Sequence, residues 1–177
     1  MKKYLFFVLF VIAIPAAAQT SQKDILLKHW KTSGDFTVAV ANAMPSDAYT
    51  FRPTPEEMSF GELMAHIAAL DRNACANASG LTPPALPTKI EEWTRDTAKV
   101  DVEKETAIQF IKESFEFCNK AITEMPVSRM DSIVGPPNRN LTGFEWLWSY
   151  FTHTAHHRGQ AEVYLRLKGI KPPLYAF

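Results

Sequence analysis

The residues best suited to chemistry are histidines near the C-terminal end of the chain. His153 and His157 lie four positions apart in the stretch 150–160. On an α-helix this spacing puts both imidazoles on one face, one turn apart, where they can chelate one divalent ion. The spacing also leaves open a His153–His156 pair. Alternatively, these histidines bind no metal and are surface residues or hydrogen-bonded packing residues.

A useful metal site needs a third ligand from another element. His66 is the best candidate, because it borders the apolar stripe of a predicted helix and bundles build sites from side chains on facing helices. His29 is the reserve ligand. Three imidazoles would leave a coordination position open, as in catalytic zinc sites. Zinc or nickel is the expected ion, although imidazoles also suit copper and iron.

The residue that follows His153 argues against a zinc peptidase. That motif needs a glutamate directly after the first histidine as general base, and Thr154 stands there. Glu62 lies one turn before the predicted third ligand, but a helix-capping role explains it equally well. Tyr150 and Gln160 are the candidates for the surrounding pocket. The catalytic residues therefore stay unassigned.

Four segments with helical periodicity must position these side chains. Each opens with a capping signal: Ser21, Ser59 with Glu62, Asp101, and Thr142 with Glu145. The predicted helices cover about 21–44, 59–78, 101–125 and 142–168, and no alternating pattern competes as a strand. The fold class expected is all-α, a four-helix bundle. The long connections 80–100 and 127–141 are expected to be loops, with a short helix at 89–93.

The N-terminus has the pattern of an export signal. Lys2 and Lys3 precede an apolar run over 4–14, which is too short to span a bilayer, and small residues follow at 16–18. We interpret 1–18 as a cleaved signal peptide and 19–177 as one domain, periplasmic or secreted, without stable membrane insertion. An uncleaved anchor is the alternative.

Charge and cysteine content narrow the function further. The whole chain has 19 basic and 19 acidic residues, so loss of Lys2 and Lys3 leaves 17 against 19, a net charge of −2. Such a chain is a poor nucleic-acid binder. Cys75 and Cys118 could pair in an oxidising compartment. We favour an unpaired Cys118, because it falls on an apolar helical stripe where a thiol packs as a small hydrophobe.

Two groups of motifs resemble the DinB/YfiT-like superfamily. The first runs from His153 through Gln160 and continues into 164–173, and the second joins 49–53 to 59–63 and His66. The resemblance covers most of the predicted mature chain. It implies a four-helix bundle with a three-histidine divalent metal site, whose ligands carry over to His66, His153 and His157. Gln160 and Arg158 also match motif positions, Gln160 beside the ligands and Arg158 in a bundle ion pair.

The resemblance implies a metal-dependent enzyme on a small substrate but does not fix the reaction. Members of the superfamily include thiol-dependent transferases and isomerases, and others are regarded as metal-dependent hydrolases. A bound metal can deprotonate a thiol without a protein base. Export argues against the thiol-dependent reaction, since low-molecular-weight thiols work chiefly inside cells. A non-catalytic metal- or ligand-binding bundle is the alternative function, and a homodimer stays open.

Overall fold

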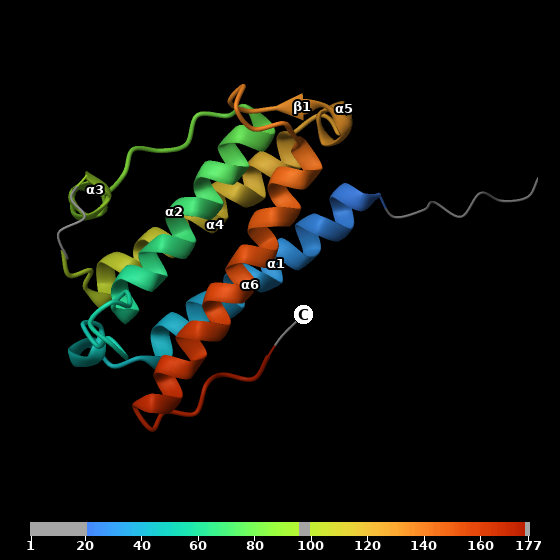
Figure 1. Ribbon diagram of the computed structural model, residues 1–177. Coiled ribbons are helices and arrows are strands. Elements are labelled where there is room, and N and C mark those ends of the chain that lie inside the picture. Colours follow the sequence, from blue (N-terminus) through green and yellow to red (C-terminus); the bar gives the residue numbers. More distant parts are fainter. Residues whose placement is uncertain (1–20, 96–99, 176–177) are drawn as a thin grey trace, which may run out of the picture.

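The computed structural model describes residues 21–95 and 100–175 (Figure 1). The predicted signal peptide lies outside this range, so the division into 1–18 and 19–177 stays a prediction. Four long helices form the bundle: α1 (Gln22–Ala43), α2 (Phe60–Ser79), α4 (Lys104–Glu124) and α6 (Gly143–Leu167). The all-α prediction is thereby confirmed for the bundle. No helix of the described ranges is long and apolar enough to cross a membrane.

Local capping fixes where three of the four helices begin. The Ser21 side chain accepts a hydrogen bond at the start of α1, and Ser59 and Thr142 each form a complete capping box at α2 and α6. The prediction for the third helix was wrong at its start: α4 begins after Glu103, not after Asp101. Glu103 is the extended residue that precedes the helix, and its side chain makes no capping hydrogen bond.

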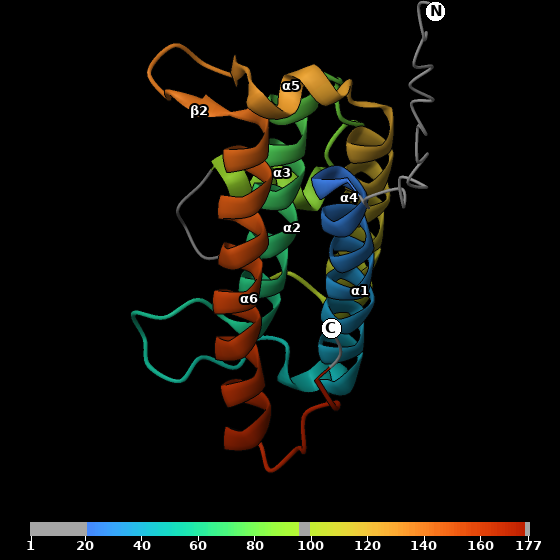
Figure 2. The same ribbon diagram turned by 90° about the vertical axis from the view of Figure 1, so that its right-hand side faces the viewer.

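The helices are not all antiparallel to their neighbours in sequence. Lys104 at the start of α4 donates to the carbonyls of Asn42 and Met44 at the end of α1, whereas Lys23 at the start of α1 donates to Met125 after α4. α1 and α4 are therefore antiparallel, α2 and α4 are parallel, and so are α1 and α6 (Figure 2). The crossover between α2 and α4 carries the predicted short helix, α3 (Thr88–Arg95).

A disulfide joins the parallel helices α2 and α4. Cys75 of α2 and Cys118 of α4 are bonded, with their Cα atoms 5.3 Å apart, and both are fully buried. Our preference for an unpaired Cys118 was therefore wrong. The apolar stripe was correct, but the parallel arrangement of α2 and α4 places a second sulfur beside it.

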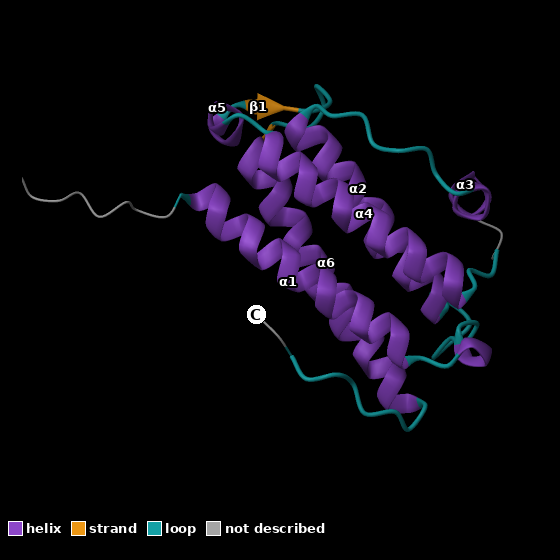
Figure 3. Cartoon of the chain, turned by 180° about the vertical axis from the view of Figure 1, so that it is seen from behind, coloured by secondary structure: helices purple, strands orange, loops and turns teal. Residues whose placement is uncertain are grey.

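The connection between α4 and α6 is structured, contrary to the predicted loop (Figure 3). It contains α5 (Val127–Asp131) and a small antiparallel hairpin of β1 (Ile133–Val134) and β2 (Leu141–Thr142). The Trp146 indole of α6 donates to the Val134 carbonyl at 3.0 Å and holds the hairpin to the bundle. The short strands escaped prediction because two-residue pairings have no periodic signal. One 3₁₀ turn, η1 (Ser46–Ala48), follows α1.

Candidate metal centre

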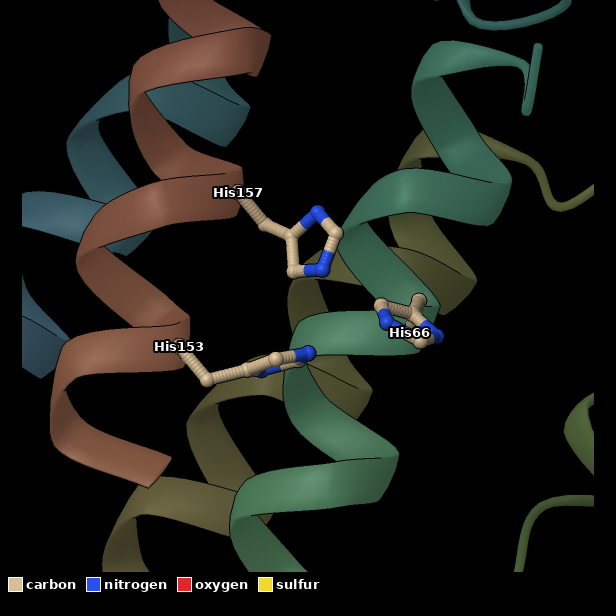
Figure 4. Close-up of side chains that lie close together, drawn as sticks. All are labelled: His66, His153 and His157. Atoms are coloured by element: carbon tan, nitrogen blue, oxygen red, sulfur yellow. The ribbon is translucent and has the colours of Figure 1, made fainter. Parts of the chain in front are cut away.

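Three histidines converge between α2 and α6 (Figure 4). His153 and His157 project from successive turns of α6 toward His66 on α2. The ring centroids are 5.1 Å apart for His66 and His153, 4.7 Å for His66 and His157, and 4.3 Å for His153 and His157. One ring nitrogen of each lies within 4.8 Å of the other two. The structure therefore brings together the three residues that the sequence predicted.

The separation of these nitrogens fits one metal ion. Because the three nitrogens are at most 4.8 Å from one another, an ion placed between them would lie at most about 2.8 Å from each nitrogen. A movement of under about 1 Å per ring then reaches the zinc–nitrogen distance of about 2.1 Å. Nδ1 of His153 is buried and has no hydrogen-bond partner in the described part of the chain. The group could hold a metal ion.

The electrostatic environment keeps the imidazoles neutral. Burial, and then the neighbouring His157, lower the pKa of His66 to about 4. Burial, and then the neighbouring histidines His157, His66 and His156, lower the pKa of His153 to about 4. The pKa of His157 is also lowered, by burial, despite the opposing effect of the hydrogen bond that it makes to the Gln160 amide oxygen. At neutral pH the ring nitrogens thus have lone pairs to offer to a cation.

Gln160 fixes the orientation of one of the rings. Its Oε1 lies 2.6 Å from Nδ1 of His157, and its amide nitrogen lies 3.3 Å from Nε2 of His156. Since an amide oxygen only accepts, Nδ1 of His157 carries the proton and Nε2 is left as the ligand atom. This is the usual way in which a second hydrogen bond sets the tautomer of a metal-binding histidine. Gln160 thus lies beside one of the candidate ligands, as the sequence predicted.

A buried carboxyl group beneath the site was missed by the sequence reasoning. Asp71 of α2 is fully buried, and the Thr154 hydroxyl of α6 donates to it, with both carboxyl oxygens at 2.7 Å. Burial raises the pKa of Asp71 to about 8, although Thr154 and Arg158 act in the opposite direction. Asp71 follows Ile67 by four residues, on the apolar stripe, and that placement was the available signal. The contact fixes α6 against α2 next to the ligands.

The remaining candidates have different positions. His29 lines a cavity between α1 and α6 and does not belong to the cluster. The Tyr150 ring lies 5.6 Å from that of His153, as a pocket residue would. Glu62 completes its capping box and binds Arg52, whose Nη2 is 2.8 Å away, so its predicted structural role is confirmed.

Arg158 differs from its prediction. It donates to the Ser33 hydroxyl and carbonyl of α1, and it appears in none of the ion pairs among the described residues. The described residues therefore do not contain the predicted bundle ion pair, and the side chain instead contacts hydroxyl and carbonyl groups of α1.

The fold and the histidine cluster define a class: four-helix bundles with a candidate metal centre between two helices. Within this class, residues 29–161 match the family model of the DinB superfamily, and the chain belongs to that superfamily. The predicted resemblance is confirmed.

Individual relatives agree with this assignment. The protein YjoA of Bacillus subtilis (strain 168) is 27% identical over 152 residues, which cover 84% of this chain and 92% of YjoA. The crystal structure of a DinB-like protein from Bacillus cereus ATCC 10987 superposes with a TM-score of 0.70 at 18% identity, covering 85% of this chain and 95% of the other. The structure of YjoA gives 0.65 at 19% identity, over 85% and 96% of the chains. These structures are similar in fold.

Proposed function

We propose that this protein binds one divalent metal ion through His66, His153 and His157 and acts as a metal-dependent enzyme on a small substrate. The observation that supports it is the convergence of three ring nitrogens within 4.8 Å of one another. Three neutral imidazoles favour zinc or nickel, with copper and iron as weaker candidates. This donor set also leaves a coordination position for a substrate.

The chain's own residues would hold and orient rather than transfer protons. A bound divalent ion would supply Lewis acidity, which lowers the pKa of a nucleophile. Gln160 orients His157, and the ring of Tyr150 lies beside His153. Glu62, an acid one turn before His66, is occupied by Arg52 and Ser59. The reaction is therefore one that needs little help from a protein base, either hydrolysis of an activated bond or attack by a thiol.

The disulfide supports an exported location. Structural disulfides persist in oxidising compartments and are rare in the cytosol. The buried Cys75–Cys118 bond agrees with the signal peptide predicted at 1–18. Export favours hydrolysis over thiol transfer, because low-molecular-weight thiols are chiefly intracellular. N-terminal sequencing of the protein recovered from the periplasm or medium tests this location, with a mature start near Gln19 expected.

Metal content is the first experiment. The mature protein should hold about one equivalent of zinc or nickel by elemental mass spectrometry. The double variant His153→Ala/His157→Ala should lose it. The matched control His29→Ala/His156→Ala removes two histidines outside the cluster and should keep the metal. Absence of metal from the wild type, even after reconstitution with zinc and nickel salts, would refute the site.

A non-catalytic metal-binding bundle is the second candidate, and the commitment of Glu62 to Arg52 favours it. The loaded protein should then turn over no ester, amide or thiol-acceptor substrate. Removing the histidines should only lower its melting temperature. Turnover that disappears together with the metal in His153→Ala/His157→Ala would instead establish the enzyme.

A further inference from the structure

A cavity lies on the other side of α6 from the histidine cluster. It occupies about 440 Å³ between α1 and α6, within the range of small-molecule sites. Trp148 and Phe151 line it, and at 3.6 residues per turn they project from roughly the opposite face of α6 to His153 and His157. α1 and α6 run side by side here (Figure 2). The cavity is therefore separate from the histidine cluster.

One end of the cavity is apolar and open to solvent. Its walls there consist of aliphatic side chains from α1 and aromatic side chains from α6: Ile25, Leu26, Phe144, Trp148 and Phe151. Ile25 is 47% exposed and Trp148 51% exposed, although both are large and apolar. Trp148 stacks on Phe151, with ring centroids 6.0 Å apart, so this wall is a preformed aromatic surface.

The other end holds a buried positive charge. Since α1 and α6 are parallel, their first turns line the same end of the cavity, and Ser33 and Arg158 line the opposite end. Arg158 is 4% exposed, and its Nη1 donates to the hydroxyls of Ser33 at 2.7 Å and Thr37 at 3.3 Å. These partners are neutral. The guanidinium also lies over the Phe36 ring, 4.7 Å from its centroid, and no ion pair within residues 21–95 and 100–175 includes it. A buried guanidinium without an anion is costly, so an anion in the cavity would be favoured.

The neighbouring acids are paired with other residues. Arg158 has its largest charge interaction with Tyr175, then with Glu162 and then with Asp71. Glu162 forms an ion pair with Arg166, Asp71 accepts a hydrogen bond from Thr154, and no ion pair among the described residues joins either carboxyl group to Arg158. The Arg158 end of the cavity is thus electropositive.

We propose that the α1–α6 cavity binds a small carboxylic acid with an apolar body, whose carboxylate pairs with Arg158 and whose body lies along Trp148 and Phe151. A neutral apolar molecule would leave the guanidinium without an anion. A small inorganic anion would leave the apolar walls in water. An amphipathic acid satisfies both ends, and this assignment does not depend on the function of the metal centre.

Titration calorimetry with octanoate and octanol tests the charge requirement, since the two differ only in the head group. Octanoate should bind at one site, and octanol at least about tenfold more weakly, as expected for the loss of a charge-assisted hydrogen bond. A carboxylate could also ligate a metal, so the titrations are repeated with His153→Ala/His157→Ala. Octanoate binding that persists in this variant supports the α1–α6 cavity, and binding that vanishes with the histidines refutes it.

Two variants locate the binding. Arg158→Met keeps the length and apolar stem of the side chain, and it should weaken octanoate about tenfold to a hundredfold without changing octanol. If Arg158→Met does not fold, Ile25→Asp decides, because it places a negative charge at the exposed mouth and should also abolish octanoate binding. Val127→Asp changes an exposed apolar position on α5 outside the cavity, 63% exposed against 47% for Ile25; it is the control and should bind normally.

Three outcomes would overturn the proposal. Equal affinities for octanoate and octanol would show that Arg158 does not bind the carboxylate head group. Binding unchanged in Ile25→Asp would place the ligand elsewhere. A wild-type dimer in sedimentation that Ile25→Asp converts to a monomer, with no octanoate bound by either, would make this face a surface for self-association.

Discussion

Breaking the disulfide between Cys75 and Cys118 should remove a large part of the stability of the bundle. The bond joins α2 to α4, which are parallel and connected by a crossover that runs the length of the bundle. Without the bond, the unfolded chain can separate these two segments freely. Reduction should therefore destabilise the fold mainly through the entropy of the unfolded state.

The size of the effect follows from the length of the closed loop. The two cysteines are 43 residues apart in the sequence. In the chain-entropy model a loop of this size contributes about 4 kcal/mol at 25 °C. With a urea dependence of about 2 kcal/mol per molar, the unfolding midpoint should fall by about 2 M. The melting temperature should fall by roughly 8–16 °C, at 2–4 °C per kcal/mol for a domain of this size.

Equilibrium urea unfolding followed by circular dichroism, with and without a strong reductant, measures this difference. All samples contain a chelator, because a bound metal would add its own stabilisation. The variant Cys75→Ala/Cys118→Ala separates two contributions. Oxidised against reduced wild type reports the cross-link, and reduced wild type against the variant reports the packing of two buried sulfurs. The variant itself should not respond to reductant.

The reasoning would be refuted if oxidised and reduced wild type unfolded at the same urea concentration while a thiol assay showed complete reduction. A fall in stability that appeared only in the alanine variant would indicate that packing, not the cross-link, stabilises the contact between α2 and α4.

Three further predictions concern the site and the helices that position it. Burial lowers the pKa of His66 and His153 from 6.5 to about 4, so the folded metal-free protein favours their neutral forms. Its free energy of unfolding should therefore be highest above pH 6.5 and should decrease as the pH falls toward 4. Urea unfolding midpoints at several pH values should show this decrease, and substituting both histidines with asparagine should flatten the profile. A Cβ at Gly61 would lie 2.0 Å from a backbone carbonyl oxygen, whereas one at Gly159 meets nothing within 4 Å. The variant Gly61→Ala should therefore unfold at a markedly lower temperature, while Gly159→Ala should gain about 1 kcal/mol from helix propensity. Equal effects of the two substitutions in thermal melts would contradict this. Thr154→Val should cost about 1–3 kcal/mol by leaving a buried carboxyl group without its hydroxyl partner, and Thr154→Ser should restore most of it in the same unfolding assay.

Much of the fold was predictable because its signals are local. A capping box involves residues three apart, and an apolar stripe repeats every three or four, so Ser59 and Thr142 marked helix starts without knowledge of the tertiary structure. The chelating pair was predictable for the same reason, since helix geometry alone puts His153 and His157 on one face. The start of α4 was not, because its first residue follows Glu103, which makes no side-chain capping hydrogen bond and so leaves no local signal.

The sequence by itself determined the four long helices, the histidine pair and the capping residues that begin three of the helices, because each depends on neighbours within about four residues. Only the tertiary structure decided which distant residues meet. It selected His66 over His29 as the third histidine, paired Cys75 with Cys118, and turned Arg158 toward α1. These contacts depend on which helices are parallel and which faces they share, and periodicity within one helix carries no information about its partner.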